Sequence, residues 1–534
     1  MNGDSEGFKI AFVNLKTRIA CHFAGSSFTL ENLGLSYLTS VLRRHGYEVT
    51  IVDAATRDLS KEKIVQEVLD FSPSMVGFSP TVATMESAIQ ISNLLKKADN
   101  TIHICLGGHH ATFLAEQLLL KESCFDSVVR GEGELTIVEL VDRLSLKSTL
   151  HDILGVYFKE KTGGVYKNPS RDKIKDLDSI PFPSRDALKW QGQNGIPPTA
   201  RIISSRGCIA NCSFCSIPPF ERQQKGQLWR ARSAQNVLDE LTYLREDFGV
   251  KTVLFAEDNF VGPGDDGRER VRQIAEGMIS RGLGLSFRIL CTAESLIKCE
   301  ALLPLLKKAG LERVIVGIES ASPSTLRIFN KKSTVEQHYL VARMLARHGI
   351  VLHLGFIMFH PYSTADSLLQ NAEFLDRINQ ACFFQHFSNR MELYPGVAIL
   401  KRLEEENMII SNTEYKKGFL YRYAEPSMGQ LARSLSRIRR KMGDLDRSLL
   451  DMDIWLSQGE NTALSADLIK EYAGLRQGFS SQNMDFFLGS LGLAEAGWNS
   501  ENFEELKGEY LYNIGKLGNA LRSMVTTYSL PMTL

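Results

Sequence analysis

Apolar positions in the first quarter of the chain follow two alternating spacings. Short runs rich in β-branched and aromatic residues predict strands at residues 9–15, 48–52, 75–79, 101–106 and 126–129. Between these runs, apolar residues recur every three or four positions, as at Leu35, Leu38 and Leu42, which predicts helices. Strands that alternate with helices of this length favour a doubly wound parallel sheet with helices on both faces.

A second series of strand–helix units begins near residue 198. Before it, residues 153–168 predict a hairpin that turns at Gly163 and Gly164. The later strands are predicted at residues 200–205, 252–257, 286–291, 313–318, 352–358 and 383–387. Six such units suit an incomplete TIM-type barrel, whose site lies at the carboxyl ends of the strands. Beyond Glu404 the pattern is helical, with one apolar stripe from Met428 to Leu449.

The predicted fold class is therefore α/β with a helical C-terminal region. We expect a doubly wound sheet domain at residues 1–148 and a hairpin and connector at 149–197. A partial (β/α)6 barrel is expected at 198–400, followed by helices at 401–534.

Composition and charge narrow the function classes. The 534 residues include 62 Lys and Arg and 62 Asp and Glu, so the formal net charge is zero. This balance disfavours non-specific nucleic-acid binding and attachment to an anionic membrane surface. No apolar stretch approaches the ~18 residues of a membrane span, and the acidic N-terminus is unlike a signal peptide. We therefore expect a cytoplasmic protein with no membrane span.

Three of the nine cysteines lie within eight residues, directly after a predicted strand. Cys208, Cys212 and Cys215 can wrap one metal centre. A zinc ion would need a fourth protein ligand from a distant part of the chain. A [4Fe–4S] cluster normally takes four thiolates, so three would leave one iron open to a substrate or cofactor.

The pattern Cys208-x-x-x-Cys212-x-Phe214-Cys215 resembles the signature of radical S-adenosylmethionine enzymes. The resemblance implies a [4Fe–4S] cluster whose open iron chelates S-adenosylmethionine, with Phe214 near its adenine.

Two acidic segments extend this resemblance. Glu257 ends the second predicted barrel strand and Asp258 follows it, and Glu319 stands in a Gly-Ile-Glu-Ser segment. Both segments are similar to motifs of the family, so we expect these three acids to bind S-adenosylmethionine. One departure is Phe359-His360, where many relatives have glycine, which implies a different local contour.

Small residues follow the strands of the N-terminal sheet. A Gly-rich turn can have no role other than to join a strand to a helix. A dinucleotide-binding site is disfavoured, because no G-x-G-x-x-G follows the first strand. Placed before such a barrel, this domain resembles the cobalamin-binding members of the same family. The resemblance implies that cobalamin lies over these turns, against Ser79, Thr81, Gly107, Gly108, Gly131 and Glu132.

The histidines near this predicted site do not have the spacing of a cobalt ligand. The Asp-x-His-x-x-Gly motif is missing, and His22 stands at a different spacing in the loop after the first strand. We therefore expect no protein histidine on cobalt, and we expect His109 and His110 to line the pocket.

The family resemblance implies a cobalamin-dependent radical methyltransferase. It would methylate an unactivated carbon of a small molecule, a natural-product or lipid intermediate, through a 5′-deoxyadenosyl radical and methylcobalamin. An external one-electron reductant such as flavodoxin or ferredoxin would supply electrons. Ring contraction or cyclisation without methyl transfer is the alternative, and a non-catalytic sensor is a minor one. Methylthiolation of RNA is disfavoured, because it would not need the cobalamin domain. The sequence identifies no catalytic residue beyond these cofactor contacts.

Overall fold

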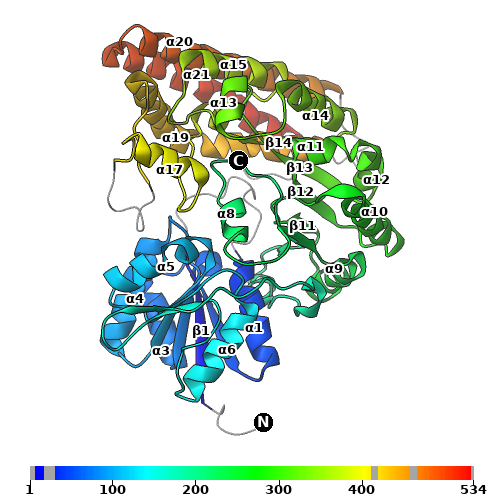
Figure 1. The fold of residues 1–534 in the computed structure, drawn as a ribbon. Coiled ribbons are helices and arrows are strands. Elements are labelled where there is room, and N and C mark those ends of the chain that lie inside the picture. The colour runs from blue at the N-terminus through cyan, green and yellow to red at the C-terminus, as the bar shows by residue number, and fades with distance from the viewer. Residues whose placement is uncertain (1–6, 17–30, 411–418, 458–465, 529, 531–534) are drawn as a thin grey trace. The chain divides into compact units, whose positions relative to one another are not determined.

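The computed structural model describes residues 7–16, 31–410, 419–457, 466–528 and 530, and its elements are labelled in Figure 1. The chain divides into two compact units. Unit 1 contains residues 1–286 together with 393–402 and 411–420, and unit 2 contains the remaining residues. The loop after the first strand, which includes His22, lies outside the described residues.

Unit 1 begins with a seven-stranded sheet of order β2-β1-β3-β4-β5-β6-β7. The strands are β1 (Lys9–Asn14), β2 (Glu48–Asp53), β3 (Met75–Phe78), β4 (His103–Leu106), β5 (Ser127–Val129), β6 (Val156–Lys159) and β7 (Val165–Lys167). The first five are parallel, as predicted. The predicted hairpin is present as β6 and β7, but it extends this sheet as two antiparallel strands.

Helices cover both faces of this sheet, because successive side chains of β1 point to opposite sides. Ala11 and Val13 join the core beneath α3 (Lys61–Phe71), α4 (Met85–Ala98) and α5 (Gly108–Lys121). Ile10 and Phe12 join the opposite core, beneath α1 (Leu33–Arg44) and α6 (Glu134–Ser145). A strand buried on both faces explains the nearly continuous apolar run of β1.

The rest of unit 1 carries the cysteine loop. Strand β8 (Thr199–Ile202) pairs in parallel with β11 (Thr252–Phe255). A short antiparallel ribbon of β9 (Ser205–Gly207) and β10 (Trp229–Ala231) flanks the loop on both sides in sequence. The helices of this part are α7 (Asp186–Gln193), α8 (Ile217–Glu221), α9 (Ala234–Phe248) and α10 (Gly264–Ser280).

Unit 2 continues the strand–helix alternation and ends in long helices. Strand β13 (Leu311–Glu319) pairs in parallel with β12 (Ser286–Thr292), which begins at the division between the units, and with β14 (Val351–Phe356). The helices between and after them are α11 (Ala293–Ile297), α12 (Leu303–Lys308), α13 (Pro323–Ile328), α14 (Val335–Arg347) and α15 (Ala365–Arg377). The C-terminal helices are α19 (Pro426–Ser457), α20 (Ala466–Glu495) and α21 (Ser500–Thr527). The predicted fold class is confirmed.

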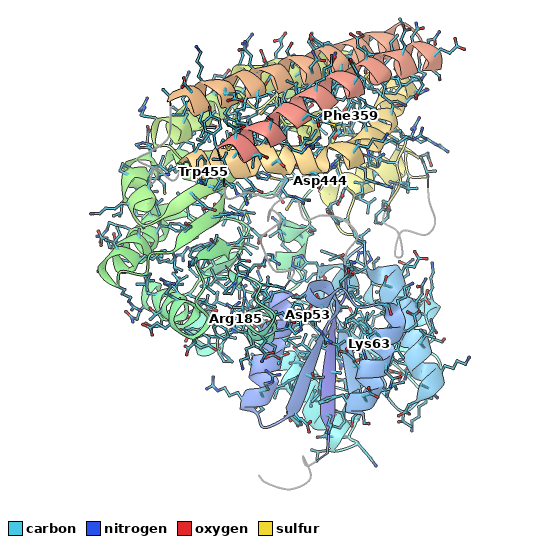
Figure 2. All side chains as sticks on the ribbon, turned by 180° about the vertical axis from the view of Figure 1, so that it is seen from behind. Asp53, Lys63, Arg185, Phe359, Asp444 and Trp455 are labelled. Carbon is cyan, nitrogen blue, oxygen red and sulfur yellow. The ribbon has the colours of Figure 1, made fainter. Side chains whose placement is uncertain are left out.

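The apolar stripe of α19 is buried, as its spacing predicted, and α19 contacts β13 and β14. Phe359 (Figure 2) is fully buried. Its ring centroid lies 6.5 Å from that of Phe487 in α20. His360 is buried beside it, with Nε2 3.1 Å from Thr325 Oγ1. Within the described residues, no helix combines the length and apolar character needed to cross a membrane.

One strand prediction is wrong. Residues 383–387 form the helix α16 (Phe384–Ser388) instead of a sixth strand. The buried carboxylate of Asp446 in α19 accepts hydrogen bonds from the backbone N–H groups of Phe384 and Gln385, both at 2.8 Å. It thereby satisfies the free donors at the start of this helix. A short apolar run does not by itself distinguish strand from helix, and here a distant side chain decides.

Burial raises the pKa of Asp446 from 3.8 to about 7, although two backbone N–H groups and Arg439 favour its ionised form. Between about pH 4 and 7 the folded state then holds a proton that the unfolded state has released, so stability falls as pH rises. Asp446→Asn removes this titration and keeps an acceptor oxygen. We expect the unfolding free energy of the wild type relative to Asp446→Asn to fall by more than about 1 kcal/mol between pH 5 and 8 in denaturant titrations.

The matched control is Asp444→Asn, because Asp444 lies on the same helix with an exposed carboxylate that pairs with Arg447. Its unfolding curve should shift with pH in parallel with the wild type. The same parallel behaviour in Asp446→Asn would contradict the prediction.

Candidate active site

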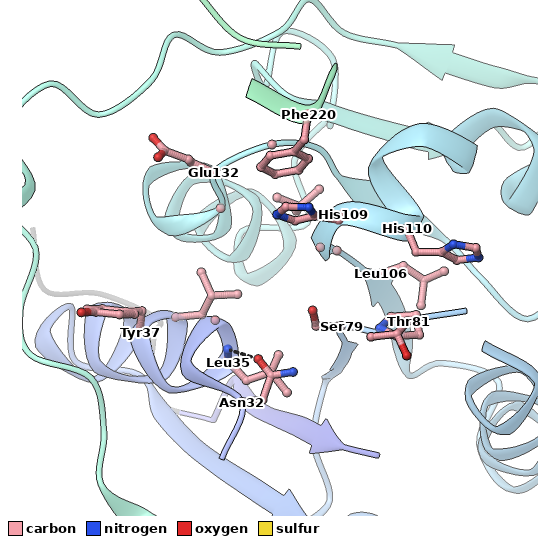
Figure 3. Close-up of a pocket in the computed structure, with 18 of the residues that line it drawn as sticks. Asn32, Leu35, Tyr37, Ser79, Thr81, Leu106, His109, His110, Glu132 and Phe220 are labelled. Carbon is pink, nitrogen blue, oxygen red and sulfur yellow. Dashed lines mark hydrogen bonds between the residues drawn. The ribbon is translucent and has the colours of Figure 1, made fainter. Parts of the chain in front are cut away.

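A cavity of about 530 Å³ lies within unit 1, at the carboxyl ends of the N-terminal strands (Figure 3). The turns after β3, β4 and β5 form one wall. The residues predicted there to contact a cofactor all line it: Ser79, Thr81, Gly107, Gly108, Gly131 and Glu132.

Two of these positions require glycine. Gly108 has φ +84°, and a Cβ atom there would lie 2.6 Å from Ser79 Oγ. Gly131 has φ +73°, and its Cβ would lie 2.3 Å from the side-chain carbonyl carbon of Gln224. A larger residue at either position would be strained and would also displace a neighbouring side chain.

Glu132 faces the cavity, but arginines engage its carboxylate. Arg230 approaches both carboxylate oxygens, at 2.7 and 3.0 Å, and Arg206 lies 3.3 Å from Oε1. The backbone N–H of Ile174 donates to Oε2 at 2.9 Å. Burial acts against the charge, yet these partners hold the pKa of Glu132 below its ordinary value. A predicted cofactor contact is thus also an ion-pair centre.

The cysteine loop begins where β9 ends. Cys208 is buried, Cys212 and Cys215 are partly buried, and none of the three forms a disulfide bond. The N–H of Cys215 donates to the carbonyl of Cys212 at 3.3 Å, which turns the loop back on itself. Burial raises the pKa of Cys215 to about 12, and the neighbouring groups Asp258, Cys212 and Cys208 add to this effect.

The described part of the chain contains no preassembled group of three Cys, His, Asp or Glu side chains that could hold a metal ion. The donor set nevertheless fits an iron–sulfur cluster, because three cysteines outside disulfides on one short loop supply the thiolate ligands that such a cluster takes. Gly207 and Ser216, on either side of the loop, line the cavity. Phe214 is half-buried and is not among the lining residues.

Glu257 follows β11 and is buried at the cavity wall. Its Oε1 accepts from the N–H of Ser204 at 2.8 Å and from Ser204 Oγ at 2.6 Å, and its Oε2 accepts from Ser205 Oγ. Arg270 donates to Ser204 Oγ at 2.9 Å. Glu257 therefore fixes the chain between β8 and β9, a role that its position in the sequence did not indicate.

Asp258 differs from its neighbour, because its side chain is open to the cavity. Loss of hydration on the concave wall, together with the nearby carboxylate of Glu221, raises its pKa to about 7. Of the two acids, Asp258 has the side chain that a ligand in the cavity can reach.

Glu319 ends β13 in unit 2, at an irregularity in the pairing with β14. Its φ of +67° is unusual for a residue with a side chain. A Cβ at Gly317 would lie 2.7 Å from Glu319 Oε1, which explains the glycine of this segment. Burial raises the pKa of Glu319, and Lys331, 3.8 Å away, opposes the shift. Such local strain is typical of functional positions.

Several residues that line the cavity were not predicted to do so. Tyr37, Arg206, Phe220 and Tyr394 are among them. His109, expected as pocket lining, also lines the cavity and stacks on Phe220, with ring centroids 3.7 Å apart and planes at 10°. Burial lowers the pKa of His109 to about 4, which keeps its ring neutral. Asn32, another lining residue, had a detectable signal as a helix N-cap residue, and its Oδ1 accepts from Leu35 N–H.

Two family descriptions match the chain. The B12 binding domain matches residues 23–141, and the Radical SAM superfamily matches residues 202–375. Each match lies within a domain expected from the sequence.

Named relatives and solved structures agree with these matches. An uncharacterized methyltransferase of Pyrococcus horikoshii is 33% identical over 384 residues, covering 71% of this chain and 80% of that protein. The anaerobic magnesium-protoporphyrin IX monomethyl ester cyclase of Rubrivivax gelatinosus is 32% identical, covering 62% of this chain and 60% of the cyclase. The cobalamin-dependent S-adenosylmethionine radical enzyme OxsB shares the fold, with a TM-score of 0.76, 18% identity, and coverage of 99% of this chain and 82% of that one. TsrM from Kitasatospora setae matches with a TM-score of 0.60 and 16% identity, over 91% of this chain and 99% of that one.

The different surroundings of Glu257 and Asp258 generate a paired test. Glu257→Gln places an amide against donors that already need an acceptor, so we expect a loss of about 1–3 kcal/mol of unfolding free energy. Asp258→Asn should not lower stability, because its side chain is open to the cavity and the substitution removes a charge that the cavity wall disfavours. Denaturant titration measures both. Equal stability of the two variants would contradict the structural role of Glu257.

Proposed function

Because the chain belongs to the cobalamin-binding radical S-adenosylmethionine enzymes, we propose that it is a methyltransferase acting on an unactivated carbon of a small molecule. One observation carries the proposal. A single cavity is lined both by the turns predicted to bind the corrinoid and by residues next to the cysteine loop and the second barrel strand. Methyl donor, radical source and substrate must meet in such a space.

We assign the cofactor contacts as follows. Cys208, Cys212 and Cys215 hold the [4Fe–4S] cluster, and the Gly-rich turns after β3, β4 and β5 hold cobalamin. Phe214, Glu257, Asp258 and Glu319 serve S-adenosylmethionine, as the motif resemblance implies. When bound, these groups supply a carbon-centred radical and a transferable methyl group. We also propose the domain limits 1–148, 149–197, 198–400 and 401–534, and the two family matches support the first and third.

The protein's own residues bind, orient and exclude water. Asp258 can accept a hydrogen bond from an ammonium or hydroxyl group, and such charge-assisted bonds are worth about 1.5–3 kcal/mol. Phe12, Leu35 and Leu106 give the cavity apolar walls. Burial raises the pKa of Tyr37 to about 12, so its hydroxyl keeps its proton at neutral pH. Apolar walls and neutral donors protect a reactive carbon from water.

Cyclisation without methyl transfer is the second candidate, because two relatives named as cyclases match this chain over 60% and 63% of their own length. Both reactions need the same cofactors and an external one-electron donor such as flavodoxin or ferredoxin. They differ in the product, which carries a new methyl group in one case and a new ring in the other.

The proposed methyl transfer is tested with S-adenosylmethionine labelled in its methyl group. Cells with and without the protein are compared by metabolite mass, and the reconstituted enzyme is given each compound that differs. We expect the label in the product. An unlabelled product with a new ring would replace the proposal by cyclisation.

Replacement of all three loop cysteines by alanine should remove iron and sulfide, and near-stoichiometric iron in this variant would overturn the cluster assignment.

We expect cobalamin to bind with no protein histidine on cobalt. His109 and His110 both line the cavity, as expected, but His110 is buried in the first turn of α5 and the ring of His109 is stacked on Phe220. Paramagnetic resonance of the cob(II)alamin form should show no nitrogen splitting from a lower axial ligand. A splitting that disappears in a His22, His109 or His110 variant would refute this expectation.

A further inference from the structure

A short segment that begins two residues after the third cysteine, residues 217–224, touches two of the turns assigned to the corrinoid, those after β4 and β5. It starts with α8 and ends before β10. All of its contacts described below lie within unit 1.

Phe220 makes the first contact. Its ring stacks on His109, the second residue of α5, and meets Phe113 edge-on with centroids 6.4 Å apart. The N–H of Phe220 donates to the carbonyl of Ser216 at 3.1 Å, so one helical turn separates it from Cys215. Pro218 and Pro219 restrict the backbone of this turn. The position of Phe220 is therefore determined by the position of the end of the cysteine loop.

Glutamines at the end of the segment make the second contact. Gln224 Oε1 accepts from the N–H of Glu132 at 2.8 Å, and its side chain packs on Gly131. Arg130 donates to Gln223 Oε1 at 2.6 Å. The turn after β5 is thus held in place by the residues that follow the cysteines.

The third contact lies at the start of the cysteine loop. A Cβ at Gly207, the residue before Cys208, would lie 2.9 Å from the carboxyl carbon of Glu221. The Glu221 carboxylate pairs with Lys173 at 2.8 Å, and both side chains are buried. One segment therefore contacts the start of the cysteine loop, its end, and both turns.

We propose that the 217–224 segment couples cluster assembly to corrinoid binding, with Phe220 and Gln224 as positioning residues. The inference rests on the cofactor assignment of the proposed function. A cluster held by three thiolates fixes the loop geometry, and metal binding of this kind orders the chain around it. The ordered segment holds Gly108, His109, Gly131 and Glu132 in the arrangement to which the corrinoid binds. Coupling between two sites is reciprocal, so bound corrinoid also favours the assembled cluster.

The test measures hydroxocobalamin affinity by absorption under anaerobic conditions, on the full chain with its cluster and after removal of iron by a chelator. We expect the cluster-bearing protein to bind about fivefold or more tightly, the lower range of typical couplings. In the reverse direction, cobalamin should slow loss of iron to the chelator. The paramagnetic signal of the reduced cluster should also change when cobalamin is added.

Phe220→Ala and Gln224→Ala should bring the two affinities together and abolish the change in the cluster signal. Phe220→Leu keeps most of the apolar volume without the ring stack, so it serves if the alanine variant is unstable. The matched control is Phe248→Ala, whose ring meets Tyr243 within α9. It should retain the wild-type ratio.

Equal affinities with and without the cluster in the wild type would overturn the coupling. A ratio that persists in all Phe220 and Gln224 variants would overturn this segment as its route. Failure of a different kind, with no cobalamin bound at all or iron retained without the three cysteines, would instead overturn the cofactor assignment.

Discussion

The buried charge pairing around Glu132 holds the two parts of the candidate site in register. Glu132 follows Gly131 in the turn after β5, and its carboxylate is shared by Arg230 and Arg206. Arg206 lies in β9, two residues before Cys208, and also reaches Glu134 at 2.5 Å. Its guanidinium lies over the ring of Tyr37, 5.4 Å from the centroid. Removing one partner of a buried charge pair costs about 3–5 kcal/mol, because the other charge is left unpaired. These charged side chains are therefore stable in the interior only as a complete set.

Much of this arrangement could be predicted from the sequence, because its elements are local. The parallel strands follow from short apolar runs, and the Gly-rich turns lie at their carboxyl ends. Gly108 and Gly131 show why: each has a positive φ and no room for a Cβ. Three thiols within eight residues likewise indicate a metal centre without any knowledge of tertiary structure.

The remainder depends on contacts between distant residues. Glu257 reads as a free strand-end acid until Ser204 and Ser205 are placed against it, 53 and 52 residues away. Residues 383–387 read as a strand until Asp446 is placed at their N–H groups. The stack of His109 on Phe220 joins positions more than a hundred residues apart. No local pattern encodes such pairings, and the family matches end at residue 375, before the C-terminal helices.

The hairpin of β6 and β7 affects how readily the protein aggregates at high protein concentration. A parallel sheet that ended at β5 would offer unpaired backbone groups to another chain. Here the outermost strand is β7, only three residues long, and its Lys167 is exposed and paired with Glu116. Short edge strands that carry charge are poor templates for further pairing. This margin of the N-terminal sheet is therefore protected against edge-to-edge aggregation by the same connector that leads the chain toward the cysteine loop.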